Sequence, residues 1–155
     1  MTGFHTLIGI DPGSTTGVFV VDIEDGQMHV DDAWFLQCDA KTVPSLMHTL
    51  YEMDRDLSSW IVAVEKYVVS SRSARSSTPS GREDALEVIG QLGSLLCTDY
   101  RPAATVKPWA TDKRLEAAGL LDRTKGMGHA RDAARHALYA AVHRGLIKDP
   151  LSGAQ

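Results

Sequence analysis

Three acidic residues stand where the surrounding sequence gives a carboxylate no packing role. Asp11 follows the apolar residues 7–10 and precedes a Pro-Gly turn, so it marks the end of a buried strand. Glu65 interrupts a second β-branched run, and Asp132 lies near the start of an alanine-rich helix, three residues after His129. Because an unpaired buried carboxylate is costly, we expect Asp11 to have a partner, namely a metal ion, a metal-bound phosphate or a hydrogen-bonded turn.

The chemistry that would use such acids is phosphodiester hydrolysis by two metal ions. If the strands of Asp11 and Glu65 are neighbours, their carboxylates face each other across about 5 Å, and their repulsion is hard to explain without a bound cation. Oxygen ligands favour Mg²⁺ or Mn²⁺. Asp11 would bridge both ions, while Glu65 and Asp132 would each hold one. His129, on the helix face of Asp132, would be a ligand or would relay a proton for the attacking water.

Hydroxyl and basic residues close to these acids in the sequence suit contact with phosphates. Ser14 and Thr15 follow the Pro-Gly turn and could bind a phosphate through hydroxyls or turn amides. Residues 70–82 are rich in serine and contain no acid, which predicts a cationic loop that binds backbone phosphates. The arginines of this loop are Arg72, Arg75 and Arg82.

Each of these features also has an ordinary structural interpretation. An aspartate before Pro-Gly often only forms its own turn, Glu65 could be an edge-strand charge that opposes aggregation, and Asp132 could simply favour a helix N-terminus. The loop at 70–82 could be a plain linker. His136 and His143 are interpreted as packing or surface residues, and the three tryptophans as core residues and not base-stacking platforms, namely Trp34, Trp60 and Trp109.

The elements that must position these residues alternate along most of the chain. Strands are predicted at 7–10, 18–22, 28–30, about 33–36, 60–69 and 103–108, with a hairpin turn at Asp25-Gly26. Helices are predicted at 41–57, 83–97, 109–121 and 128–146. This order predicts an α/β fold with a mixed five-stranded sheet, an antiparallel meander plus parallel strands, flanked by helices. Residues 1–148 are expected to form a single domain and 149–155 a flexible tail.

Length and charge fit a globular protein with a basic face. The chain has 155 residues, about one domain. Its net charge is −4, yet residues 1–60 carry ten acids and two bases, whereas residues 101–148 carry four acids and ten bases. A basic patch is the electrostatic footprint of a nucleic-acid-binding protein. Without a signal peptide or an apolar run of membrane length, we expect a cytoplasmic protein with no membrane partner and with reduced cysteines.

Three segments together resemble one family. The segments "IGIDPGSTTG", "VAVEKY" and "GHARDAARHAL" are similar, in order and spacing, to the acidic motifs of RuvC-type Holliday junction resolvases, which have an RNase H-like fold. The resemblance implies that Asp11, Glu65 and Asp132 bind metal, and that His129 takes a position that the family fills with Asp or His. The basic residues Lys107 and Lys113 match the family's basic positions loosely. Tyr67 lies one position closer to the second acid than the family's aromatic wedge.

The resemblance implies a nuclease with two metal ions in each site. The expected activity is Mg²⁺-dependent cleavage of branched DNA, namely Holliday junctions and also forks or flaps, with Mn²⁺ able to replace Mg²⁺. Lys107 would support catalysis, Tyr67 and Lys113 would bind DNA, and a homodimer would present two sites. No nucleotide cofactor is expected. The alternatives are a non-catalytic RNase H-like module that binds nucleic acid and an actin- or sugar-kinase-like ATPase, and an RNA substrate also stays open.

Overall fold

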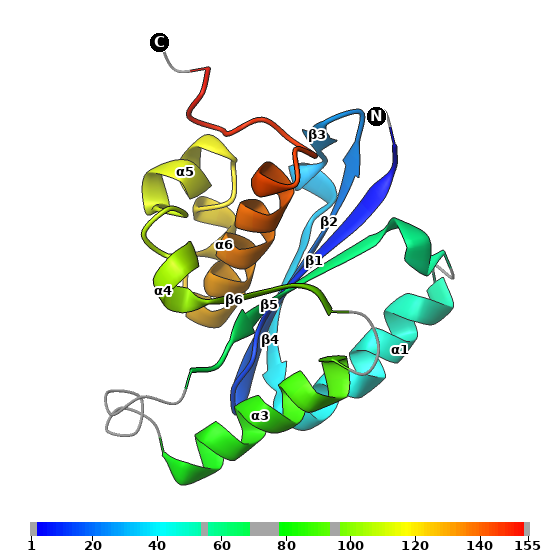
Figure 1. Cartoon of the computed structure of the whole chain (residues 1–155), viewed down its shortest axis with the longest axis vertical. Coiled ribbons are helices and arrows are strands. Elements are labelled where there is room, and N and C mark those ends of the chain that lie inside the picture. The colour runs from blue at the N-terminus through cyan, green and yellow to red at the C-terminus, as the bar shows by residue number, and fades with distance from the viewer. Residues whose placement is uncertain (1–2, 54–55, 69–77, 94–96, 154–155) are drawn as a thin grey trace.

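A twisted mixed sheet forms the centre of the molecule (Figure 1). The computed structural model describes residues 3–53, 56–68, 78–93 and 97–153. Within these residues the sheet has six strands in the order β3-β2-β1-β5-β6, with β4 also paired to β2. The strands are β1 (His5–Asp11), β2 (Thr15–Glu24), β3 (Gln27–Met28), β4 (Trp34–Asp39), β5 (Trp60–Lys66) and β6 (Cys97–Pro102).

The sheet combines the predicted antiparallel meander with parallel strands. β1 pairs antiparallel with β2, and β2 pairs antiparallel with β3 and β4. β1 and β5 are parallel neighbours, as are β5 and β6. The predicted hairpin turn is confirmed at Asp25 and Gly26, whose φ angles of 51° and 79° are those that a tight two-residue turn requires. The two-residue β3 corresponds to the strand predicted at 28–30, and the sheet has six strands where a five-stranded sheet was expected.

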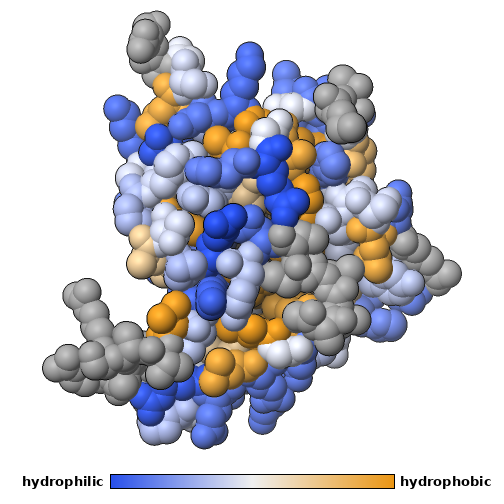
Figure 2. All heavy atoms as spheres, in the orientation of Figure 1, coloured by the Kyte–Doolittle hydropathy of each residue, from blue (hydrophilic) through white to orange (hydrophobic). Residues whose placement is uncertain are grey.

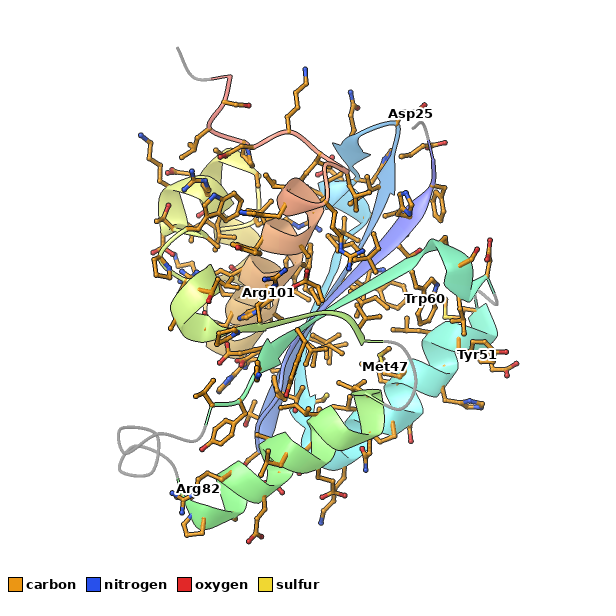
Figure 3. The ribbon with its side chains drawn as sticks, in the orientation of Figure 1. Asp25, Met47, Tyr51, Trp60, Arg82 and Arg101 are labelled. Atoms are coloured by element: carbon orange, nitrogen blue, oxygen red, sulfur yellow. The ribbon has the colours of Figure 1, made fainter. Side chains whose placement is uncertain are left out.

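Helices cover both faces of the sheet (Figure 1). On one face lie α1 (Val43–Met53) and α3 (Pro79–Gly93), and on the other α4 (Ala103–Val106), α5 (Asp112–Ala117) and α6 (Gly128–His143). Each face has its own apolar cluster, since alternate strand residues point to opposite sides. In Figure 3, Met47 of α1 and Trp60 of β5 lie between α1 and the sheet, and both are buried. Trp34, which the sequence placed in the core, is instead 50% exposed at the start of β4.

Helix α6 packs directly on the backbone of β1 and β2. A Cβ atom added to Gly17 would lie 2.0 Å from the carbonyl oxygen of His129, and one added to Gly9 would lie 2.1 Å from that of Ala133. Only glycine permits this approach. The alanines of the helix are small enough to lie flat on the sheet, and Ala133, Ala134 and Ala137 are fully buried. The start of α6 is therefore fixed close to the end of β1.

The last predicted strand is wrong. Residues 103–106 of the strand expected at 103–108 form the short helix α4, and the last strand, β6, lies instead at Cys97–Pro102, beginning at the last residue of the predicted helix. A short run such as "AATV" suits either structure, and its context decides. The helix expected at 83–97 begins earlier, at Pro79, where the Thr78 hydroxyl accepts a hydrogen bond from the Gly81 amide at 3.1 Å.

The C-terminal segment begins with an anchored residue. The Arg114 guanidinium donates to the carboxylate of Asp149, with Nη2 and Oδ2 3.1 Å apart, and this contact lowers the pKa of Asp149. Arg114 also stacks on the Trp109 ring, 4.5 Å from its centroid. Among the described helices, none is both long and apolar enough to span a bilayer.

Candidate active site

The carboxyl ends of β1 and β5 and the N-terminal half of α6 meet at one end of the sheet (Figure 1). Ile10 pairs with Val64 across the parallel strands, so Asp11 and Glu65 follow on neighbouring strands at the same edge. Asp132 comes from α6, which packs against β1, β2 and β5. The structure thus brings together three acids that are far apart in the sequence.

Asp11 is the most buried of these acids. Its side chain is 11% exposed, and its Oδ2 lies 2.8 Å from Nδ1 of His129. Burial first, and then the charges of Glu65 and Asp132, raise the pKa of Asp11 to about 6, against the lowering effect of its contact with His129. The negative charges of the other two acids thus contribute to the raised pKa of Asp11.

Lys107 lies between the two other acids. Its Nζ is 2.7 Å from Oδ2 of Asp132 and 3.8 Å from Oε2 of Glu65. Burial alone would lower the pKa of Lys107, but the hydrogen bond to Asp132 and the charges of the acids raise it overall. Burial would raise the pKa of Asp132, and the contacts with Lys107 and Arg135 lower it instead. Both pKa shifts follow from the ion pair between Lys107 and Asp132.

Two contacts in the cluster come from residues that the sequence did not indicate as site residues. Nη1 of Arg135 lies 2.6 Å from Oδ1 of Asp132, and its Nε donates to the Ala110 carbonyl at 3.0 Å. Arg135 also contacts Asp112 at the start of α5. His136, interpreted from the sequence as a packing or surface residue, is buried as expected, but its Nε2 lies 3.2 Å from Oε2 of Glu65. The only signal in the sequence was a charged and an imidazole side chain within an alanine-rich helix.

A side chain of β4 holds the first turn of α6. The backbone amide of His129 donates to Oε1 of Gln37 at 2.8 Å. The residue before the helix, Met127, provides no side-chain cap, so Gln37 satisfies one of the free amides of this helix end from a distant strand. His129 is thereby fixed through its backbone as well as through its contact with Asp11.

The residues predicted to contact DNA are spread over the rim of this region. Ser14, in the turn after β1, and Thr15, the first residue of β2, are both exposed, and the buried Thr16 closes the turn by donating to the Gly13 carbonyl at 2.8 Å. Tyr67 follows β5 and is half-buried, and Lys113 is exposed on α5. Arg82 lies near the N-terminal end of α3 (Figure 3). Arg72 and Arg75 lie outside the described residues.

A hydrophilic band crosses the face seen in Figure 2, over β6 and α6. Ion pairs join three residues there: Arg101 Nε lies 3.5 Å from Asp99 Oδ1, and Arg144 Nε lies 3.9 Å from Asp99 Oδ2. Figure 3 labels Arg101 on β6 in the middle of this band. The contacts of Arg101 and Arg144 with an acid show that these bases are at least partly neutralised.

The chemistry of the acid cluster fits a divalent cation, although its arrangement is not that of bound ligands. Asp11, Glu65 and Asp132 offer hard oxygen donors, and the raised pKa of Asp11 reflects its burial and, next, its repulsion from Glu65, a repulsion that a cation would relieve. Across the described parts of the chain, no three His, Cys, Asp or Glu side chains form a group that could hold a metal. The ammonium of Lys107 contacts the carboxylates of Asp132 and Glu65 in this structure.

Comparison with known proteins gives a structural match and no match by sequence. No family model matches the chain, and no curated protein matches it. Among solved structures, T. thermophilus RuvC in complex with a Holliday junction substrate is similar, with a TM-score of 0.54 and 19% sequence identity. The match covers 90% of this chain and 96% of that one. The predicted RNase H-like α/β architecture is confirmed, and the chain has a RuvC-like fold.

Proposed function

We propose that this protein is a divalent-metal-dependent endonuclease that cleaves branched DNA, with four-way junctions as its main substrate. The observation that carries the proposal is the meeting of Asp11, Glu65 and Asp132 at one edge of the sheet, with the pKa of Asp11 raised to about 6. The RuvC-like fold supports it, because the similar T. thermophilus protein was solved with a Holliday junction substrate.

In this proposal the three carboxylates and His129 hold two Mg²⁺ ions, for which Mn²⁺ can substitute. The ions would supply an activated water and charge stabilisation at the leaving oxygen. Asp11 would contact both ions, and Glu65 and Asp132 one each. His129 would complete the donor set or accept a proton from the attacking water.

The basic residues of the cluster have a separate role. Lys107 pairs with Asp132 and Glu65 in the structure, and we propose that its ammonium turns to a phosphate oxygen when cations bind the acids. Ser14, Thr15 and Tyr67 would contact the DNA beside the cut. Lys113, Arg82, Arg72 and Arg75 would neutralise backbone phosphates further away.

The test is cleavage of a panel of labelled substrates with Mg²⁺, Mn²⁺ or EDTA. The panel contains a four-way junction, a fork, a flap, a linear duplex, a single strand and an RNA–DNA hybrid. We expect metal-dependent cuts in the junction that Asp11→Asn abolishes. Asp22→Asn is the matched control, because the Asp22 carboxylate lies on β2 and accepts a hydrogen bond from Thr6 at 2.9 Å instead of joining the acid cluster.

Other outcomes separate the alternatives. Cleavage mainly of forks and flaps would keep the site and change the substrate, and cleavage of the hybrid would assign an RNA strand. DNA binding without any metal-dependent cut would contradict the enzyme and favour the binding module. ATP hydrolysis without DNA would favour the kinase-like ATPase.

A further inference from the structure

Helix α6 buries a histidine on a face that is otherwise made of small apolar side chains. His136 is 2% exposed, and the other buried residues of the helix are alanines and Leu138. Burying an imidazole costs free energy unless its polar atoms find partners. A leucine would fill this position without that cost, so packing alone does not explain the histidine.

The partner of the imidazole is one of the three clustered acids. Nε2 of His136 lies 3.2 Å from Oε2 of Glu65, and Nζ of Lys107 lies 3.8 Å from the same oxygen. An ionised carboxylate can only accept hydrogen bonds, so Nε2 carries the proton whenever Glu65 is charged. His136 therefore holds Glu65 from the buried side, whereas Lys107, 42% exposed, reaches it from the solvent side.

We propose that His136 is a positioning residue that fixes Oε2 of Glu65 and so sets the orientation of this carboxylate toward a divalent cation. The inference rests on the proposed function, since it takes Glu65 to be a metal ligand. Loss of a hydrogen-bonded partner of a metal ligand typically weakens metal binding or activity about 10- to 100-fold. Because His136 is buried, we expect DNA affinity not to depend on it.

Three variants test this role. His136→Leu removes the N–H and keeps an apolar side chain of similar size, and His136→Gln restores an N–H at a similar reach. His143→Leu is the control on the same helix, because its ring stacks on Tyr139, with centroids 3.8 Å apart. The readouts are Mn²⁺ affinity by electron paramagnetic resonance on metal-free protein, DNA affinity in EDTA, and thermal unfolding.

The expected result is a loss of Mn²⁺ affinity that is specific to the missing N–H. His136→Leu should bind Mn²⁺ about 10- to 100-fold more weakly than the wild type, with unchanged DNA affinity, and His136→Gln should recover most of the loss. His143→Leu should bind as the wild type does. A folded His136→Leu protein with wild-type Mn²⁺ affinity would overturn the inference.

A second measurement decides the matter if His136→Leu does not fold. In the wild type, the Nε2–H resonance of His136 should exchange slowly with water, and Glu65→Ala should make it exchange fast. An unchanged exchange rate would overturn the inference. A wild type that neither binds Mn²⁺ nor cuts DNA would instead refute the proposed function, so the two failures are distinguishable.

Discussion

Asp11 combines burial with repulsion. It ends a strand whose residues Leu7, Ile8 and Ile10 are fully buried, and its own side chain is 11% exposed. Its carboxylate contacts the imidazole of His129 at 2.8 Å. A carboxylate whose pKa is raised to about 6 is a destabilised anion at neutral pH. We interpret the unfavourable free energy of this ionised carboxylate as a property of a site that is arranged to bind a cation.

Asp11→Asn should therefore stabilise the metal-free protein at neutral pH. The pKa of Asp11 is about 6 in the folded state against 3.8 in the reference state, so the folded state holds the extra proton and stability falls as the pH rises between these values. Relative to Asp11→Asn, the wild type should lose up to about 3 kcal/mol between pH 4 and pH 7. Urea unfolding in EDTA across this range measures the difference, and parallel curves for the two proteins would contradict it.

Arg135 should stabilise the protein through its pair with Asp132. The two side chains are 16% and 22% exposed, and one nitrogen–oxygen distance is 2.6 Å. A hydrogen bond to a charged group at this burial contributes about 1–3 kcal/mol. A double-mutant cycle of Arg135→Ala and Asp132→Ala, followed by urea unfolding, should give a coupling of this size.

The control for this cycle is an exposed pair of the same residue types. Arg123 and Asp31 lie 3.5 Å apart, and the Asp31 side chain is fully exposed. We expect no measurable coupling in that cycle, because water screens such pairs. Equal couplings in the two cycles would show that Arg135 does not hold Asp132 in place.

At the scale of elements, the site depends on how closely α6 approaches the sheet. The helix carries Asp132, His129, Arg135 and His136, whereas Asp11 and Glu65 belong to β1 and β5. A shift of the helix by about 1 Å would alter the contacts between these two groups, and such misplacement can cost about 100-fold in rate. The backbone contact at Gly17 and Gly9 therefore fixes the geometry of the site as well as the fold.

Gly17→Ala should be strongly destabilising. Its Cβ would lie 2.0 Å from the carbonyl oxygen of His129, which is main chain and cannot rotate away. Overpacking of this kind costs about 3 kcal/mol or more. Gly90→Ala is the matched control, because its Cβ would meet nothing within 4 Å on α3, and it should gain about 0.5–1 kcal/mol. Thermal unfolding of both variants checks the prediction, and a Gly17→Ala protein as stable as the wild type would refute it.

The sequence predicted those features of the site and the fold that local residue patterns determine. Asp11 and Glu65 stood out because each interrupts an apolar strand. The parallel pairing of β1 with β5, which the sequence left open, places them at one edge of the sheet. The roles of Arg135, His136 and Gln37 could not be predicted, since their contacts depend on the rotation of α6 against the sheet. The strand β6 was misplaced because a short apolar run near Pro102 does not distinguish strand from helix.

At the scale of the whole molecule, the site brings together residues from the acidic and the basic parts of the chain. The acidic residues 1–60 supply Asp11, strand β5 supplies Glu65, and the basic residues 101–148 supply Asp132 together with Lys107 and Arg135. The contact of Lys107 with Glu65 thus joins the basic C-terminal part of the chain to β5 at the place where we propose cleavage.

Cleavage of both strands of a junction should require two subunits. The described residues of one chain form one such acid cluster, and a symmetric dimer would present a second cluster to the opposite strand. On a supercoiled plasmid with an extruded cruciform, the wild type should give linear product, from two opposed cuts made before the junction is lost. Excess Asp11→Asn should place most wild-type subunits in mixed dimers and convert the product to nicked circles. The same excess of Asp22→Asn should leave the linear product dominant. A linear fraction that does not change with added Asp11→Asn would show that each subunit cuts on its own.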